Sequence, residues 1–538
     1  MKKNYKIKHT SNNNPKKVPA SKTDNVFLLF IVGIYFTLLI IGVIKHEMWR
    51  DEWQAWLIAI DSHSLRELYE NCRYEGHPIL WHLLLFIITS FSHNPFYMQL
   101  LHIGIATISV FLFNRYSQLP VWQRILFTFG YYSLYEYSII ARSYSLDLML
   151  VLLFCTLYKN KGQNFIWIFF VLSLLANNSL YGLATACCLV AFLLLDYKIN
   201  KSYWNYEIVS KYKLSISLFI FLLCACFSLI QIKPESDHER NISFLHLFNV
   251  DIIKFISSRI YNAYILIPEL KIFPTWNEGA YVSNSAKEPF LSLLIFFGAI
   301  FILVRKPIVC ALYVVGTIGM VYLVGVVGCY SPRYIGHIFI FFVTAIFLSN
   351  QFPDEIFSNK ILNKWAQIGK SLQSVFIFIV FGCQMIVGIA YYYNDFLKPF
   401  SMSKKAAQYI YDKKMESLPI VGTRDYVLSN LAALLGKKIF YPERNAFASF
   451  IIWDGNRNLN RPFEAIIHNV DSLLTGVHPK VLLILNYPLT YMNGNSQFLF
   501  TNGMLSSTIR LSFLNKFEGG MVKDESYYIY IASKKSSP

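Results

Sequence analysis

One unbroken apolar segment near the N-terminus constrains this chain more than any other feature. Residues Val26 to Ile44 carry no charge and lie between Asp24 and Lys45. About 20 apolar residues in a helix span the roughly 30 Å hydrocarbon core of a bilayer, where a helix satisfies its own backbone hydrogen bonds. The segment is too long for the apolar part of a signal peptide, and no small-residue cleavage site follows it. We therefore expect it to remain attached as the first transmembrane helix.

The composition extends this expectation to the rest of the chain. Of 538 residues, 55% are hydrophobic and 15% are charged, and the mean hydropathy is +0.39. Soluble proteins usually carry about 25% charged residues. Several further apolar runs follow the first one, so we predict an α-helical polytopic membrane protein.

The positive charge is distributed as the positive-inside rule requires. The net charge is +17, and lysines crowd the N-terminal tail, residues 1–25, and the short loops between apolar runs. Short cytoplasmic loops of membrane proteins carry an excess of Lys and Arg. This distribution places the N-terminus in the cytoplasm, and it argues against a nucleic-acid partner.

The same counting of Lys and Arg gives a topology of about eleven transmembrane helices, with the C-terminus extracytoplasmic. The apolar segment Pro78 to Phe91 is short for a crossing, and no Lys or Arg follows it, so we place it at the outer interface. Counting it as a span would put Arg115 and Arg124 outside, against the charge bias. The eleven predicted spans are Val26–Ile44, Met98–Phe113, Ile125–Ile140, Leu146–Tyr158, Phe165–Leu180, Leu183–Leu195, Leu214–Ile230, Phe290–Val304, Ile308–Val327, Ile335–Leu348 and Leu372–Ala390.

The chain changes character at about residue 394. The segment 394–538 is polar, and short strand-like runs alternate with a helical stretch, Tyr426 to Leu435. Strand, helix and strand at this spacing predict a small α/β domain outside the membrane, attached to a membrane module of residues 26–393. The strand-like runs are Leu418–Val421, Lys438–Tyr441, Val481–Asn486 and Tyr527–Ala532.

The first outer loop, residues 46–77, contains two predicted short helices. In the first, Trp53, Trp56, Leu57 and Ile60 recur at helical spacing and form one apolar face. Such a helix lies in the membrane interface. The second begins at Ser64, where Ser-Leu-Arg-Glu has capping-box spacing.

An acidic pair, Asp51 and Glu52, stands at the start of this loop. A carboxylate near the lipid phosphate level can take a proton from an acceptor hydroxyl as a general base. The alternative is that both residues are solvated at a helix N-terminus, which favours acidic side chains.

Two arginines on the same predicted outer face need an explanation. Arg142, in Ala-Arg-Ser-Tyr, and Arg333, in Pro-Arg-Tyr, lie at the outer ends of spans, where the positive-inside rule disfavours them. Guanidinium groups bind phosphate oxygens bidentately, so a lipid-linked phosphate would account for both. The alternative for each is snorkelling toward lipid headgroups.

The order of these motifs resembles the GT-C membrane glycosyltransferases, which include the protein O-mannosyltransferases and the lipid A aminoarabinose transferase. The resemblance covers about residues 25–350, and the order of the short motifs is its specific part. It implies a GT-C type fold, a polyprenyl-phosphate-sugar donor, a catalytic carboxylate in the first outer loop and inversion at the anomeric carbon. The implied acceptor is a lipid, a glycan or a protein, and the implied cofactor and metal requirement is none.

The resemblance also implies roles for single residues. Asp51 would be the general base, and Glu52 a neighbour that tunes it or positions the acceptor. Arg142 and Arg333 match basic positions near the donor phosphate. Relatives often have Lys-Pro-Pro after the acidic residue of the next motif, where this chain has Gly76-His77-Pro78, so His77 takes the place of the lysine as a phosphate contact. The candidate substrate-binding residues are Glu75, Tyr144 and Tyr334.

Two other classes of function stay open. A lipid-linked-sugar flippase would usually carry its functional charges near the bilayer midplane, whereas these charges lie at one surface. A non-catalytic scaffold would tolerate replacement of Asp51. The lysine-rich tail and short loops favour a bacterial inner membrane. We expect the loop 231–289 to shape the acceptor side of the site. Whether Cys72 pairs with Cys329 is left open.

Overall fold

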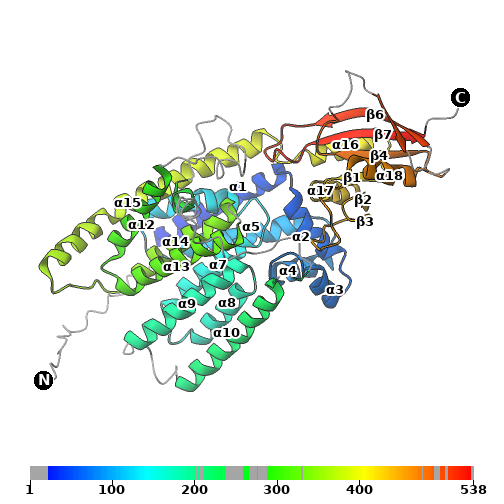
Figure 1. Cartoon of the computed structure of the whole chain (residues 1–538). Coiled ribbons are helices and arrows are strands. Elements are labelled where there is room, and N and C mark those ends of the chain that lie inside the picture. The colour runs from blue at the N-terminus through cyan, green and yellow to red at the C-terminus, as the bar shows by residue number, and fades with distance from the viewer. Residues whose placement is uncertain are drawn as a thin grey trace.

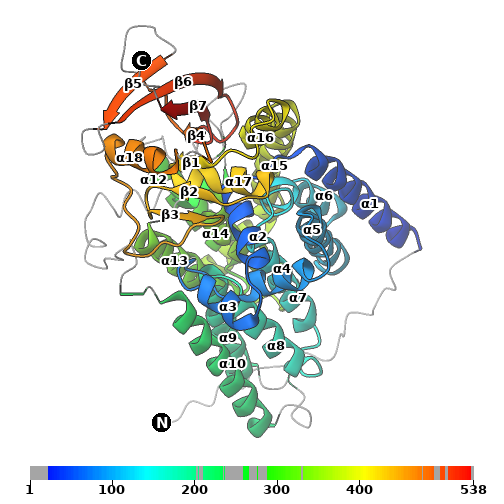
Figure 2. The same ribbon diagram turned by 90° about the vertical axis from the view of Figure 1, so that its right-hand side faces the viewer.

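The computed structural model describes residues 22–200, 204, 210–233, 235–236, 259–265, 276, 287–328, 331–474, 477–489, 497–502 and 507–534. It has a helical part and, at one end, a sheet domain (Figures 1 and 2). The helical part contains α1 (Lys22–Lys45), α2 (Arg50–Ile60), α3 (Leu65–Asn71), α4 (Leu80–Thr89), α5 (Phe96–Tyr116), α6 (Val121–Thr128), the π-helix η1 (Tyr132–Glu136), α7 (Tyr144–Tyr158), α8 (Phe165–Ala176), α9 (Leu180–Ile199), α10 (Lys211–Ile232), α12 (Lys287–Leu303), α13 (Pro307–Val327), α14 (Pro332–Ser349) and α15 (Lys360–Leu397).

Within the described residues, seven helices are long and apolar enough to cross a membrane: α1, α5, α9, α10, α13, α14 and α15. The chain is therefore a multi-pass helical membrane protein. The remaining four predicted spans correspond to the shorter segments α6 with η1, α7, α8 and α12. The total of eleven spans, and the orientation, stay predictions.

The predicted span Ile125–Ile140 is wrong as a single helix. The chain leaves α6 at Thr128 and re-forms as the π-helix η1. A Cβ atom at Gly388 of α15 would lie only 2.8 Å from the backbone of Gly130. The two backbones meet at this point, and only glycine allows such an approach.

The last predicted span is much longer than expected. Helix α15 has 38 residues, about 57 Å at 1.5 Å per residue, against a hydrocarbon core of about 30 Å. In Figure 1 it runs the length of the helical part and ends at the sheet domain. It therefore connects the two parts directly.

The expectation that α2 has a single apolar face is wrong, whereas its place in the membrane interface stays a prediction. Every residue from Glu52 to Ala59 is buried, because α2 packs against α4 and against a helix of the sheet domain, α17 (Asp425–Leu435). The predicted placement of Pro78–Phe91 is consistent with α4, whose ten residues reach only about 15 Å. Helix α3 begins at Ser64 as predicted, and the Ser64 hydroxyl accepts a hydrogen bond from the Glu67 amide.

The C-terminal part is the predicted small α/β domain, and all four predicted strand-like runs and the helical stretch are confirmed. Its seven strands have the order β3-β2-β1-β4-β7-β6-β5, with β1 parallel to β2 and β4 and every other pair antiparallel. Its elements are α16 (Ser403–Asp412), β1 (Ile420–Thr423), α17 (Asp425–Leu435), β2 (Ile439–Tyr441), β3 (Ala446–Ala448), α18 (Phe463–Leu473), β4 (Lys480–Leu485), β5 (Gln497–Asn502), β6 (Ser507–Phe517) and β7 (Tyr527–Lys534).

Helices cover both faces of this sheet. Leu482 and Ile484 of β4 pack with α16 and α17, whereas Val481 and Leu483 pack with α18 on the other face. Side chains of a strand point alternately to its two faces, which explains why β4 is apolar throughout. Because α17 also packs against α2, the domain rests on the first outer loop (Figure 2).

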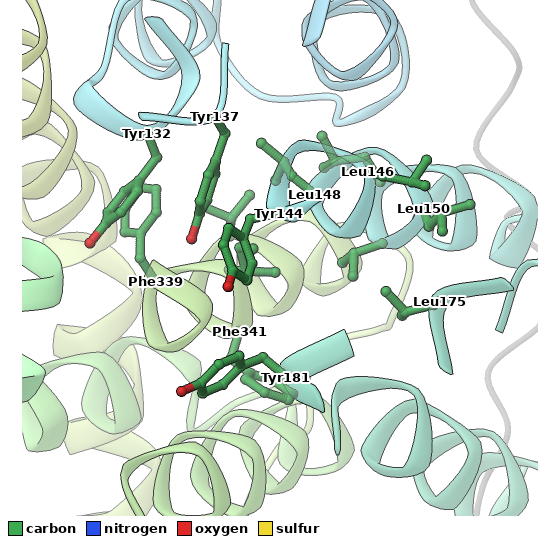
Figure 3. Packing of buried hydrophobic residues seen from close by; sticks show 14 of the residues in the cluster. Tyr132, Tyr137, Tyr144, Leu146, Leu148, Leu150, Leu175, Tyr181, Phe339 and Phe341 are labelled. Carbon is green, nitrogen blue, oxygen red and sulfur yellow. The ribbon is translucent and has the colours of Figure 1, made fainter. Parts of the chain in front are cut away.

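The core of the helical part is rich in tyrosine. Figure 3 shows the rings of Tyr132 and Tyr137 side by side next to Phe339 of α14. Their ring centroids are 5.3 Å apart, and Tyr132 lies 5.2 Å from Phe339. The Tyr137 hydroxyl donates to the backbone carbonyl of Arg333 at 2.8 Å. The core thus fixes the start of α14, where Arg333 lies.

Candidate active site

Glu52 anchors the N-terminal turn of α2. Its side chain is fully buried. One carboxylate oxygen lies 3.0 Å from His46 Nε2 and accepts a hydrogen bond from the Trp49 amide at 3.0 Å. The other accepts from the Ala141 amide at 2.7 Å. Glu52 therefore ties the start of α2 to the segment that carries Arg142.

His46 connects this anchor to the end of the helical part. Its Nδ1 lies 2.7 Å from the Asp395 carboxylate in α15, and its ring is buried. Burial alone would lower the pKa of His46, but the Asp395 and Glu52 carboxylates outweigh it and raise that pKa to about 10. A protonated imidazole therefore bridges two buried carboxylates.

Asp51 points the other way from Glu52, toward a cluster of arginines. Its carboxylate is 29% exposed and lies 3.1 Å from Arg333 Nη2. The Arg50 Nε lies 4.0 Å from the same carboxylate, and Arg142 donates to the Asp51 backbone carbonyl. Residues from α2, α14 and the segment before α7 thus meet around one carboxylate.

The arginines keep Asp51 ionised. Burial would raise the pKa of Asp51, but Arg333, Arg142 and Arg50 together hold that pKa below its ordinary value. An opposite charge within a few ångströms favours the charged form of a carboxyl group.

Both arginines retain free hydrogen-bonding capacity. Within the part of the chain that the structure describes, Arg333 Nε and Nη1 and Arg142 Nε are buried without a hydrogen-bond partner. The Arg333 guanidinium lies 4.7 Å from the ring centroid of Trp49 and 5.5 Å from that of Trp276. Aromatic rings hold a guanidinium in place while leaving its N–H groups available. This arrangement can bind an anion.

The second motif of the loop lies beside this cluster. Glu75 accepts a hydrogen bond from Gln54 Nε2 of α2 at 2.8 Å, and burial raises the pKa of Glu75 to about 7. Gly76 has a φ of +66°, a left-handed conformation that favours glycine, and this turn directs His77 inward. Burial, followed by the charge of Arg142, lowers the pKa of His77 to about 3, so His77 is neutral.

The two candidate tyrosines line the same region. Tyr144 at the start of α7 has its hydroxyl 3.3 Å from His77 Nε2, and its ring meets that of Tyr334 edge to face at 5.6 Å. Tyr334 also stacks on Tyr181 at 5.3 Å. Tyr144, labelled in Figure 3, lies close to Tyr137 and Tyr181 of the core. Both tyrosines are thus held by the packing around the arginines.

All eight predicted site residues therefore lie in one region, but the Glu52 carboxylate is buried, whereas the Asp51 carboxylate is partly exposed beside Arg333. The sequence analysis did not single out His46, Gln54 and Asp395, because buried polar residues leave no periodic pattern in a sequence.

Several predictions concern residues that the structure does not describe. The tail up to residue 21, most of the loop 231–289 and Cys329 lie outside the described residues. Cys72 is buried as a free thiol. Among the described residues, no group of three or more His, Cys, Asp or Glu side chains is arranged to hold a metal ion.

The comparisons with known proteins give one distant likeness. No protein-family model and no curated protein sequence matches the chain. Two crystal structures of ArnT from Cupriavidus metallidurans, bound to undecaprenyl phosphate and in the apo state, match 95% of this chain and 99% and 98% of theirs, with a TM-score of 0.46 and 11% identity in both cases. ArnT is a GT-C aminoarabinose transferase, the class that the motifs resemble. At this TM-score the likeness by itself establishes neither a shared fold nor a shared activity.

Proposed function

We propose that the chain is a membrane glycosyltransferase that moves a sugar from a polyprenyl-phosphate donor to a hydroxyl acceptor at the extracytoplasmic face. The observation that carries the proposal is an ionised, partly exposed carboxylate, Asp51, 3.1 Å from an arginine whose other N–H groups find no partner among the described residues. A base for the acceptor and a site for the donor phosphate are thus adjacent.

The donor phosphate would be held by Arg142 and Arg333, which come from separate segments of the helical part. Both present buried N–H groups that lack a partner within the described part of the chain, and charge-assisted hydrogen bonds to phosphate are among the strongest in proteins. His77, being neutral, would contribute a hydrogen bond but no charge. Glu75, Tyr144 and Tyr334 would complete the wall around the sugar.

Donor binding would activate Asp51. Without an anion the arginines keep the pKa of Asp51 low, which makes it a weak base. A bound phosphate would neutralise Arg142 and Arg333 and raise the pKa of Asp51, because a like charge nearby disfavours ionisation. The base would therefore strengthen only when the donor is present.

In the transfer step, Asp51 takes the proton of the acceptor hydroxyl while the oxygen of that hydroxyl attacks the anomeric carbon of the sugar. The bond between that carbon and the phosphate oxygen breaks, and polyprenyl phosphate leaves with the electron pair. The guanidinium groups stabilise the charge that develops on the phosphate. Attack opposite the leaving group inverts the anomeric configuration.

Glu52 has a different role in this proposal from the one that the sequence suggested. Its oxygens are occupied by His46, Trp49 and Ala141, so it cannot contact an acceptor. It is a positioning residue, which fixes Asp51 relative to Arg142.

An assay in proteoliposomes distinguishes the proposed glycosyltransferase from the alternative, a flippase. A radiolabelled polyprenyl-phosphate sugar and a membrane extract containing acceptors are supplied with the purified chain. The proposal expects the label to appear in a product with inverted anomeric configuration. Movement of intact labelled donor between leaflets, with no new glycosidic bond, would refute it in favour of the flippase. The bacterial inner membrane, with the N-terminus cytoplasmic, remains the proposed location.

A further inference from the structure

A small polar cavity opens beside the candidate active site. It has a volume of about 240 Å³, and its lining residues come from α3, the turn that follows it and the end of α10. This volume is below the roughly 300–1,000 Å³ of sites for drug-sized molecules, and it suits a group of one sugar ring. The lining residues are Tyr69, Cys72, Arg73, His77, Ile79, Ile230, Gln231 and Glu235.

His77 connects the cavity to the reacting groups. Its Nε2 lies 3.3 Å from the Tyr144 hydroxyl. Its Nδ1 is buried without a partner among the described residues. The charges of Arg142 and Arg333 both act on this imidazole. A group bound in the cavity would therefore lie next to the proposed donor site, separated from it by one side chain.

Gln231 provides a second group without a partner. Its side chain is 8% exposed, and its Oε1 accepts a hydrogen bond from the Ile79 amide at 3.1 Å. Its Nε2 is buried and makes no hydrogen bond within the described ranges. Because a buried N–H group without a partner is unfavourable, this amide has a hydrogen bond to gain from a ligand.

The charge of the wall indicates what kind of ligand would bind. Arg73 and Glu235 both line the cavity and form a direct ion pair, so their charges cancel, and His77 is neutral. An anion or a cation would find no unbalanced partner in this wall, whereas a neutral polyhydroxyl group would find both donors and acceptors. The Tyr69 ring adds an apolar surface of the kind on which a sugar ring can rest.

We propose that this cavity binds a neutral sugar residue of the acceptor, so that the acceptor of the transfer is a glycan. The assignment of the bound sugar to the acceptor rests on the proposed function. The binding of a neutral sugar in the cavity does not depend on that function. The donor sugar is attached to the phosphate at Arg142 and Arg333, beside Asp51. A residue that lies beyond His77 belongs to the other substrate.

The test measures binding of simple sugars to the full chain in nanodiscs by saturation-transfer-difference NMR. The probes are the methyl glycosides of glucose, galactose, mannose and N-acetylglucosamine, with glucose 1-phosphate as a charged comparison and empty nanodiscs as background. Gln231→Glu keeps the acceptor for the Ile79 amide and replaces the free N–H donor with an oxygen. Gln367→Glu, at an exposed position of α15, introduces the same charge elsewhere.

We expect at least one neutral glycoside to bind the wild type, and Gln231→Glu to weaken it about three- to tenfold, the effect of one hydrogen bond. Gln367→Glu and Asp51→Asn should leave binding unchanged. No binding by any neutral glycoside, or equal binding by the wild type and Gln231→Glu, would overturn the inference. Binding that is lost with Arg333→Met but not with Gln231→Glu would assign the sugar to the donor site and also overturn it. If neutral sugars bind as expected but no transfer is found, the proposed function fails and this binding site stands.

Discussion

Replacing Glu52 by glutamine should destabilise the chain strongly, although the two side chains have nearly the same shape. One oxygen of the amide can still accept from the Ala141 amide, as Glu52 does at 2.7 Å. The NH₂ group then faces the His46 ring and the Trp49 amide, both of which donate to Glu52 at 3.0 Å. Two hydrogen bonds are lost, one of them with a charged partner.

The magnitude follows from these two losses. A hydrogen bond to a charged group contributes about 1.5–3 kcal/mol, and an unsatisfied buried amide costs about 1–3 kcal/mol. Together they give about 3–5 kcal/mol, the range measured when one partner of a buried ion pair is removed. For a chain of this length that corresponds to a fall of about 3–5 °C in the apparent Tm.

Asp51→Asn is the matched control, because it makes the same chemical change one residue earlier. The Asp51 carboxylate is 29% exposed and has one close ion pair, with Arg333. The asparagine oxygen can still accept from Arg333 Nη2, so the substitution should cost about 1–2 kcal/mol, less than Glu52→Gln. Intrinsic tryptophan fluorescence during heating, in one detergent, measures both variants. Equal destabilisation by the two substitutions, or a Glu52→Gln variant that unfolds at the wild-type temperature, would refute the assignment of Glu52 as the buried anchor.

Three further predictions concern the donor site, the buried histidine and the sheet domain. Arg333→Met should weaken binding of a polyprenyl phosphate at least about tenfold, measured by native mass spectrometry, whereas replacing the exposed Arg66 in the same way should not. The apparent Tm should fall as the pH rises from about 7 to 10. The reason is that the pKa of His46 is raised from 6.5 to about 10 in the folded state, so the folded state holds this proton more tightly than the unfolded state. A His46→Asn variant with an equally steep decline would contradict this. Arg457→Ala should cost about 3–5 kcal/mol by leaving Asp425, its partner at 2.7 Å, buried and unpaired, and should make the sheet domain sensitive to limited proteolysis.

The sequence predicts the helical segments well, because each apolar run reflects a local property of the chain. It fails where a distant segment decides the outcome. Helix α2 is buried because α17 packs on it, and the two helices are separated by more than 350 residues. The break before η1 lies where the backbone of Gly130 meets that of Gly388 in α15, a contact that the segment 125–140 does not reveal.

Some residues of the candidate site can likewise be predicted from the sequence, and others cannot. Arg142 and Arg333 can be singled out from the sequence because arginine at an outer helix end is unusual and needs a reason. The residue pattern alone does not tell Asp51 from Glu52, and only the family resemblance assigned the base to Asp51. The structure separates them, because on a helix successive side chains point in different directions. The contact of His46 with Asp395, 349 residues away, is equally beyond pattern reasoning.

The most direct test of the account is the rate of sugar transfer by Asp51→Asn, with donor affinity measured on the same preparation. The account predicts that kcat falls by about 10²–10⁴, the usual contribution of a general base, while the affinity for the polyprenyl-phosphate donor stays within about threefold of the wild type. The exposed Glu70→Gln on α3 should behave as the wild type in both measurements. Transfer by Asp51→Asn at the wild-type rate would contradict the central claim that this carboxylate takes the acceptor proton.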